Sequence, residues 1–439
     1  MAALTMAVCI PTYERRDIVE DFLNNCYDTY TAAGSDLYFY DSSIGNDTQE
    51  LIQQWLPKGQ LYYIRMPSDM HPNAKAYKIF QGCGLEKEYD FILLSSDGLQ
   101  HKADIVSQAM ECLDLKHDMI ILDWIGEQDE GSRIISNLDE LMVSCAYHMS
   151  SFGAVILNTH TMLHDVDWAS YEERFLKEPF IPWSHVCYYL WRAAEMEKFE
   201  SLVLSLPFRS VRFSMHKKDS VWTEAVFPYI CEGWVRAIES LPKRYIHKDR
   251  VISEFSRDYF VNPECFLQYR RRGTFSYRIC KKYWGVWEKV TPVSRFTLLA
   301  VSLIPQKLLN GLYKLGFYKR LLRLKKFCNS HSQIVIYGKG TQGRLYGEFL
   351  EANHLKLDGF CVSHAVTKGE QFMGYPVHMF TKPEEGPCKT GYIIGVASGN
   401  APEVLASLKA TVPGDHFFLD LRLSNEIRYQ YGYSFLVIK

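Results

Sequence analysis

Residues 89–98 read YDFILLSSDG, and this stretch decides the fold that the sequence predicts. Its four consecutive apolar residues show no polar alternation, which is typical of a short strand buried on both faces of a parallel sheet. The run ends in two hydroxyls, a carboxylate and a glycine. Ligands bind at the carboxyl ends of strands in open α/β sheets, so Asp97 stands where chemistry is expected. A carboxylate there binds a divalent cation or a ribose hydroxyl, or it caps the next helix or forms a turn.

The residues before this stretch alternate between strand-like and helix-like segments. Apolar runs at 6–10, 37–40 and 61–64 predict buried strands, and residues 17–26 carry apolar side chains at helical spacing. Residues 73–84 predict a further helix that leads into the central strand. This alternation implies an α/β fold with a doubly wound parallel sheet.

Polar side chains follow three of the predicted strands. The first strand ends in Thr12, Tyr13 and Glu14, the second in Asp41, and the fourth in Asp97. The carboxyl ends of these strands are expected at one edge of the sheet. Oxygens and one aromatic ring therefore gather there, which predicts a nucleotide pocket.

Three motifs occur in order in this region, namely CIPTYER at 9–15, YDSS at 40–43 and LLSSDG at 93–98. Their order and spacing resemble the family 2 glycosyltransferases of the GT-A fold, well over roughly the first 110 residues and more weakly to about residue 250. The resemblance implies that the first two motifs hold the nucleotide. It also implies that the third binds the sugar nucleotide and a divalent cation, Mn²⁺ or Mg²⁺, and that a hexosyl group is transferred with inversion.

The resemblance assigns a set of residues to the nucleotide site. They are Pro11, Thr12, Tyr13, Glu14, Asp41, Asn73, Lys75, Ser96 and Asp97. Asp97 is also the implied metal ligand. Lys75 is expected to pair with phosphate or with Asp97. The simpler alternative is that Asn73 caps a helix and Lys75 is solvated.

The third motif departs from the family pattern. The family usually has further acidic residues where this chain has Ser95 and Ser96, so one carboxylate is left to hold the cation together with the diphosphate and water. His216, in a later basic loop, is a candidate third metal ligand or a residue of a solvated loop. The departure predicts weak metal dependence.

Candidates for the general base that deprotonates the acceptor hydroxyl lie in residues 165–186. His185 falls in the first turn of a predicted helix, where the dipole favours the neutral imidazole. A similar phenylalanine-x-histidine setting occurs in the dideoxyhexosyl transferases that this region resembles, with Trp183 in place of phenylalanine here. Asp167, Glu172 and Glu173 are alternatives, because many family members use an aspartate in this region. His185 also fits a packed core histidine.

Residues 270–326 carry fifteen lysines and arginines and one acid, Glu288, with leucines and aromatic residues between them. This mixture matches helices that lie in the interface of an anionic membrane. A nucleic acid would use the same charge, but no RNA-binding motif is present, so no nucleic-acid partner is predicted. A plain helical bridge whose leucines face the core is the other alternative. Pro292 and Pro305 divide the block, so no piece spans a membrane.

Residues 333–343 read QIVIYGKGTQG, a predicted strand followed by GxGxxG at Gly338, Gly340 and Gly343 and then by a helix. The next strand, 357–362, has no acid at its end to bind a ribose, as a dinucleotide enzyme would. The segment resembles the small nucleotide-binding domains of bacterial sugar acyltransferases and of some glycosyltransferases. An accessory Rossmann-like domain that binds a nucleotide or docks a partner is expected.

The totals set the frame for these domains. At 439 residues and 47% hydrophobic content the chain has ample core, and its net charge of −2 gives no signal for nucleic acid. We predict a GT-A domain at 1–250, a basic amphipathic bridge at 251–330 and the Rossmann-like domain at 331–439. Twelve cysteines without a CxxC pair fit a reducing cytosol. The expected location is cytoplasmic, peripheral on the inner face of the membrane.

The predicted function is a glycosyltransferase that moves a sugar from a nucleotide-sugar donor, with UDP favoured, to a polysaccharide or lipid-linked saccharide acceptor. The resemblance points to bacterial surface polysaccharide such as capsule. One alternative is a nucleotide-sugar-binding scaffold with a decayed active site, motivated by Ser95 and Ser96. Another is an oxidoreductase that works through the C-terminal domain.

Overall fold

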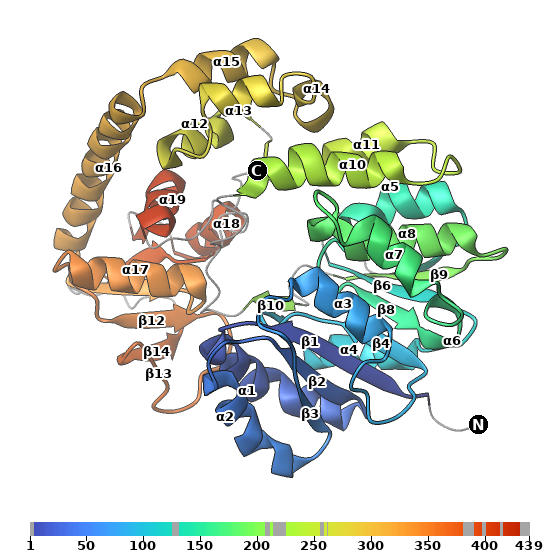
Figure 1. Ribbon diagram of the computed structural model, residues 1–439. Coiled ribbons are helices and arrows are strands. Elements are labelled where there is room, and N and C mark those ends of the chain that lie inside the picture. Colours follow the sequence, from blue (N-terminus) through green and yellow to red (C-terminus); the bar gives the residue numbers. More distant parts are fainter. Residues whose placement is uncertain are drawn as a thin grey trace. The chain divides into compact units, whose positions relative to one another are not determined.

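The computed structural model describes residues 4–124, 131–206, 211–213, 225–254, 259–260, 262–380, 390–396, 401–412 and 416–430. The chain divides into two compact units (Figure 1). Unit 1 consists of Met1–Lys217, Val226–Arg257 and Gly285–Thr291, and unit 2 of Lys218–Ala225, Asp258–Trp284 and Pro292–Lys439. Residues of the predicted bridge fall in both units, and the division into three parts stays a prediction.

Unit 1 is built on an eight-stranded sheet in the order β3-β2-β1-β4-β8-β6-β9-β7. The strands are β1 (Met6–Thr12), β2 (Asp36–Asp41), β3 (Leu61–Arg65), β4 (Phe91–Leu94), β6 (Met119–Asp123), β7 (Gly131–Ile135), β8 (Val155–Asn158) and β9 (Ser201–Ser205). β1 to β4 pair in parallel, whereas β8 runs antiparallel between β4 and β6. β5 (Leu99–His101) and β10 (Val211–Phe213) form a separate antiparallel pair. The predicted α/β fold class is confirmed.

The helices of unit 1 follow from this strand order. Because β2 and β3 lie on one side of β1 and β4 on the other, right-handed crossovers put the first two helices on one face of the sheet and α3 on the opposite face. The helices are α1 (Arg16–Ala32), α2 (Asp47–Trp55), α3 (Pro72–Phe80), α4 (Ala103–Glu111), α5 (Leu138–Met149), α6 (Thr159–Met162), α7 (Trp168–Phe175), α8 (Ser184–Glu195), α10 (Val235–Ser240), α11 (Lys248–Ile252) and α14 (Trp287–Val290). Short 3₁₀ turns occur at Leu56–Lys58 and Ile181–Trp183, and a π-helical segment at Pro228–Trp234.

Unit 2 contains a second sheet in the order β13-β14-β12-β11-β15-β16. Its strands are β11 (Gln333–Tyr337), β12 (Gly359–Val362), β13 (Gln371–Phe372), β14 (Tyr375–Met379), β15 (Thr390–Ile394) and β16 (Phe417–Phe418). All neighbours pair in parallel except β13 with β14. The strand order therefore reverses between β11 and β15, as in doubly wound sheets.

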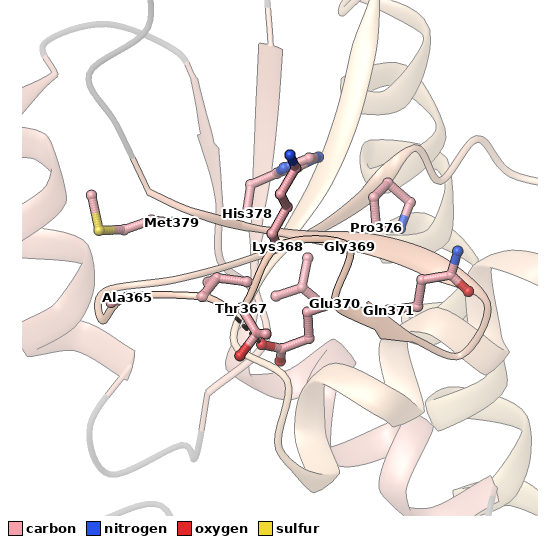
Figure 2. A pocket seen from close by; sticks show the side chains of 11 residues that line it. Ala365, Thr367, Lys368, Gly369, Glu370, Gln371, Pro376, His378 and Met379 are labelled. Carbon is pink, nitrogen blue, oxygen red and sulfur yellow. Dashed lines mark hydrogen bonds between the residues drawn. The ribbon is translucent and has the colours of Figure 1, made fainter.

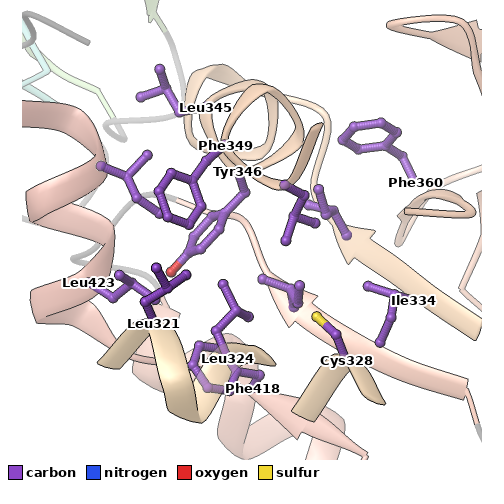
Figure 3. Close-up of a cluster of buried hydrophobic side chains, with 14 of the residues drawn as sticks. Leu321, Leu324, Cys328, Ile334, Leu345, Tyr346, Phe349, Phe360, Phe418 and Leu423 are labelled. Carbon is purple, nitrogen blue, oxygen red and sulfur yellow. The ribbon is translucent and has the colours of Figure 1, made fainter. Parts of the chain in front are cut away.

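The helices of unit 2 are α12 (Pro263–Arg272), α13 (Tyr277–Lys282), α15 (Arg295–Leu303), α16 (Gln306–Asn329), α17 (Thr341–Ala352), α18 (Ala401–Thr411) and α19 (Leu421–Gln430). A core of buried side chains joins α16, α17 and α19 to the sheet (Figure 3). Leu324 of α16 and Tyr346 of α17 are fully buried in it, and the Tyr346 hydroxyl hydrogen-bonds Ser424 at 2.6 Å. Among the described residues, no helix is both long and apolar enough to span a bilayer.

Candidate functional site

The carboxyl ends of β1, β2 and β4 bring the predicted strand-end residues together. β1 lies between the other two strands, and Thr12 at its end is paired in register with Asp41 at the end of β2. The direction of strand order reverses between β1 and β4, which is where ligands bind in doubly wound sheets. Asp97 follows β4 on the other side of this switch point.

Asp97 is almost completely buried, and both of its oxygens are engaged. The Thr12 hydroxyl donates a hydrogen bond of 2.8 Å to Oδ2, and Arg15 Nη1 donates one of 3.0 Å to Oδ1. The side chain of Asp97 is 1% exposed, whereas that of Arg15 is 41% exposed. Arg15 therefore forms the outer side of the site, and an incoming anion meets its guanidinium before it meets the carboxylate.

Lys75 supplies a second cation, from α3 on the other face of the sheet. Its ammonium is buried and donates to the Thr12 carbonyl at 2.7 Å and to the Ser42 hydroxyl at 2.8 Å. Burial lowers the pKa of Lys75 to about 8, although the nearby charges of Asp41 and Asp97 act in the opposite direction. The solvated alternative for Lys75 is wrong, because the strand ends enclose its ammonium.

Asp41 holds the second strand end together rather than facing solvent. Its Oδ1 accepts hydrogen bonds from the Ser43 amide (2.8 Å) and hydroxyl (2.5 Å), and its Oδ2 accepts one from Tyr63 (2.9 Å). Arg65 reaches the same Oδ2 at 3.5 Å. The carboxylate is fully buried, so its hydrogen bonds to Ser43 fix the position of the loop after β2.

The loop after β1 is locked against the loop after β2. Glu14 has a left-handed backbone with φ of 50°, and its carboxylate accepts hydrogen bonds from the amides of Ile44 (2.6 Å) and Gly45 (3.1 Å). Pro11 is buried within β1. Tyr13 is 42% exposed and Ile44 is 73% exposed, so an aromatic ring and an aliphatic side chain are available beside the buried polar cluster. Such a pair suits the flat face of a base.

His185 is buried next to this cluster and is joined to it through α3. Its Nδ1 lies 2.7 Å from Asn73 Oδ1, and its Nε2 lies 3.2 Å from the Ser150 carbonyl. Burial lowers the pKa of His185 to about 4. The neutral imidazole has one N–H and donates it to one of these two oxygens. The role of general base stays a prediction. Asn73 does not cap α3, because the helix begins after His71, whose ring accepts the Asn73 amide.

The carboxylate alternatives for the base lie elsewhere in unit 1. Asp167 caps α7 by accepting the Ser170 amide at 3.1 Å. Glu172 pairs with Lys78 at 3.0 Å and accepts a hydrogen bond from Gln81 at 2.6 Å. Glu173 pairs with Lys177 at 3.3 Å. Within the described part of the chain, none of the four base candidates hydrogen-bonds Thr12, Lys75 or Asp97. Their assignment is untested by this geometry.

The fit of the site to a divalent cation depends on its donor set. The described residues contain no group of three or more histidine, cysteine or acidic side chains placed to hold a metal ion. The one carboxylate at the switch point is already bonded by Thr12 and Arg15, and Ser96 Oγ lies 3.5 Å from it. A cation on Asp97 would therefore have to displace Arg15 and to take most of its ligands from a diphosphate and water. His216 lies outside the described residues. The residues that sequence reasoning missed are Arg15, which directly follows Glu14, and Ser42.

Unit 2 carries the glycine-rich loop between β11 and α17. Gly338 has φ of 106°, and a Cβ on Gly343 would lie 2.0 Å from the Gly338 carbonyl oxygen, so packing alone requires both glycines. A Cβ on Gly340 would meet nothing within 4 Å. Lys339 of this loop forms an ion pair with Glu370, which lines a hollow of about 550 Å³ between residues 365–371 and 376–379 (Figure 2).

No protein-family model matches the chain, and no curated protein matches it. Among solved structures, TarS 1–349 from S. aureus is similar to this chain, with 12% sequence identity and a TM-score of 0.40. The aligned region covers 68% of this chain and 90% of the TarS chain. The same fragment in complex with UDP-GlcNAc is also 12% identical with the same coverage and has a TM-score of 0.39. The mannosyltransferase PcManGT from Pyrobaculum calidifontis, in complex with GDP-Man and Mn²⁺, is 12% identical, covers 67% of this chain and 78% of its own, and has a TM-score of 0.37. Likenesses this distant do not assign an activity.

Proposed function

We propose that unit 1 is a GT-A glycosyltransferase that takes a sugar from a nucleotide-sugar donor, a UDP-sugar, and transfers it with inversion to a saccharide or lipid-linked acceptor. The observation that carries the proposal is the convergence of Thr12, Lys75 and Asp97 at the β1/β4 switch point. Thr12 and Asp97 come from two of the motifs that resemble those of family 2, and Lys75 comes from α3, a third segment. A surface turn or a helix cap would not bring a buried lysine and a buried carboxylate to one strand end.

The proposed roles follow from position and charge. The donor diphosphate binds beside Lys75 and draws the Arg15 guanidinium away from Asp97, since Arg15 is the more exposed partner of that pair. These cations offset the negative charge that develops on the departing diphosphate. The exposed ring of Tyr13 stacks on the base, and Asp41 positions the loop beneath it. His185, Asp167 and Glu172 remain candidates for the base that activates the acceptor.

We propose that Arg15 and Lys75, rather than a divalent cation, offset the charge of the diphosphate, because Thr12 and Arg15 already bond both oxygens of Asp97. Chelation tests this point. In the wild type, heat stabilisation by UDP should survive excess EDTA, whereas the Arg15→Gln protein should lose most of it. A wild-type response that disappears with EDTA and returns with Mn²⁺ would instead assign the diphosphate charge to a cation on Asp97.

Turnover of a donor panel tests the proposed activity. We expect slow hydrolysis of at least one UDP-sugar, and a loss of about a hundredfold or more in Asp97→Asn, because the carboxylate positions Thr12 and Arg15 at the switch point. Asp90→Asn is the matched control, because Asp90 accepts a hydrogen bond from Thr5 at the other end of β4, as Asp97 does from Thr12. UDP binding without turnover of any donor would favour the scaffold alternative. Stabilisation by NAD alone would favour the oxidoreductase.

For unit 2 we propose an accessory Rossmann-like domain that binds a nucleotide at Gly338, Gly340 and Gly343. The open space at Gly340 supports this, since the packing of the chain gives no other reason for a glycine there. We propose the cytoplasm as the compartment, because the described cysteines form no disulfide. Loss of nucleotide binding to unit 2 in Gly340→Val, with unfolding unchanged, would test the first of these points.

A further inference from the structure

Helix α16 of unit 2 has apolar side chains on two different sides. One side is buried through Leu309, Leu321, Leu324 and Cys328, of which the last three belong to the core of unit 2. The other side, which we call the outer stripe, consists of Leu308, Leu312, Leu315 and Leu322, which are 56%, 58%, 55% and 49% exposed. Their spacing of four, three and seven residues puts them in one row along the helix. Burial within the protein therefore accounts for three of the seven leucines of α16.

The charge of α16 is of one sign. The helix contains seven lysines and arginines and no acid, and no aspartate or glutamate occurs between residues 289 and 347. Arg320 and Arg323 lie 3.7 and 3.3 Å from Asp420, within unit 2. No ion pair in the described part of the chain involves Lys314 or Lys319. Lys319 lies on the outer stripe itself, between Leu315 and Leu322.

The preceding helix, α15, extends the exposed apolar surface. Phe296 is 78% exposed and Leu303 is 61% exposed, and their separation of seven residues puts them on one side of that helix. Two consecutive helices thus expose large apolar side chains, with basic residues between them, and we call these residues together the patch. The partner of this patch must bury leucine and phenylalanine and must offer negative charge.

We propose that the outer stripe of α16, with the exposed side of α15, docks on an anionic lipid surface. The helix lies in the plane of the interface, its leucines enter the boundary between headgroups and acyl chains, and its lysines extend along their aliphatic stems to lipid phosphates. α16 is about 36 Å long at 1.5 Å per residue, so the contact is extended. This inference does not depend on the proposed activity of unit 1.

A second copy of the chain is the main competing occupant. Positions 308, 312, 315, 319, 322 and 326 have the spacing of a coiled-coil seam, but Lys319 and Lys326 occupy two of them. A paired seam would bury these ammonium groups against another helix of the same positive charge. At a lipid surface the same lysines reach phosphates. The charge pattern therefore favours the membrane.

Flotation of the full-length protein with vesicles tests the proposal. We compare vesicles of phosphatidylcholine with vesicles of equimolar phosphatidylcholine and phosphatidylglycerol. The protein should float with the anionic vesicles only, and binding should weaken as salt is raised. The double variant Leu312→Ser, Leu315→Ser should lose at least about tenfold in vesicle partition. Lys319→Gln with Lys326→Gln, which removes the two lysines in the row of the outer stripe, should lose a comparable factor on anionic vesicles.

Leu115→Ser is the matched control, because Leu115 is 47% exposed in unit 1 and lies outside the patch. Its vesicle binding should equal that of the wild type. All variants should melt like the wild type, since the substituted side chains are exposed. Equal binding to neutral vesicles, or unchanged flotation of the leucine variant, would overturn the proposal. So would a dimer that the leucine variant converts to a monomer while neither protein floats.

Discussion

Replacing Lys75 with methionine should alter how the stability of unit 1 depends on pH. The buried ammonium of Lys75 donates to Thr12 and Ser42 in the folded protein. Burial lowers its pKa from 10.5 to about 8. Between these two values the unfolded chain holds a proton that the folded chain has released, so the free energy of unfolding rises with pH.

The size of this effect follows from the gap between the two pKa values. At about 1.4 kcal/mol per pKa unit, the full gap is worth roughly 3 kcal/mol, of which roughly 2.5 kcal/mol develops between about pH 7 and pH 10. The methionine variant cannot titrate at this position. It also loses two hydrogen bonds of about 1 kcal/mol each. At neutral pH this loss opposes the gain from removing a buried charge, so the absolute stability of the variant does not isolate the pKa effect. The slope against pH is therefore the quantity to measure.

The assay is denaturant unfolding of wild type and Lys75→Met at several pH values from neutral to alkaline. From neutral to alkaline pH, the free energy of unfolding of unit 1 should rise by about 2 to 3 kcal/mol more in the wild type than in the variant. The unfolding transition of unit 1 is identified as the one that the substitution shifts. Lys78→Met serves as the control for removing a lysine from α3, because Lys78 is 38% exposed. Saturating UDP should reduce the wild-type gain, since a bound diphosphate favours the charged ammonium.

Two results would refute the reasoning. Parallel pH profiles for wild type and Lys75→Met would mean that burial does not lower the pKa of Lys75. A pH profile of wild type that UDP leaves unchanged, although UDP binds, would place the diphosphate away from Lys75. The first result concerns the structure of the strand ends, and the second concerns the proposed function alone.

Three further predictions concern other parts of the chain. Gly343→Ala should destabilise unit 2 by about 2 kcal/mol or more, because its Cβ would lie 2.0 Å from the Gly338 carbonyl oxygen. Gly340→Ala should unfold like the wild type, because a Cβ there meets nothing within 4 Å. Denaturant unfolding of both variants measures the difference. Burial lowers the pKa of His185 from 6.5 to about 4, so between these values the unfolded chain binds a proton that the folded chain does not. The free energy of unfolding should therefore drop by up to roughly 3 kcal/mol as pH falls through this range. In His185→Gln this loss should be absent when unfolding is measured at several acidic pH values. Arg271→Met should cost about 3 to 5 kcal/mol in calorimetric or denaturant unfolding, because it leaves the buried carboxylate of Glu426 without the guanidinium that pairs with it, and a cost below about 1 kcal/mol would contradict this.

The sequence predicted those features of unit 1 that depend on local pattern. The run at 91–94 forms β4, and the predicted strand at 6–10 lies within β1. The rule on strand ends brought Thr12 and Asp97 together correctly, because neighbouring parallel strands share one edge. The polar residues at a strand end adjoin the strand in the sequence, so these features were accessible.

Other features of the site depend on partners far away in the chain. The exposed position of Arg15 and its bond to Asp97 follow from the path of the loop after β1, which no periodicity encodes. Nor could Lys75 be recognised as buried, because its enclosure comes from the ends of other strands. His185 was ambiguous for the same reason, since its ring partners are Asn73 and Ser150.

The insertion of β8 and the two sides of α16 were likewise hidden from sequence reasoning. The apolar residues of β8 favour a strand, but its antiparallel place between β4 and β6 is decided by tertiary pairing. The sequence of α16 shows leucines and lysines together, but their order does not indicate which leucines are buried in the core. Only packing against α17 and the sheet separates the buried row from the exposed one.

Two threonine–aspartate contacts fasten β1 to β4, one at each end, and each joins residues 85 positions apart. During synthesis, β1 can therefore pair with β4 only after most of the first hundred residues have been made. β8, which covers the other edge of β4, is made later still. A nascent chain released between these two events would carry Thr12, Lys75 and Asp97 but leave the four apolar residues of β4 on an open strand edge. Pausing of translation in that interval would favour aggregation, and a holding chaperone would be needed most there.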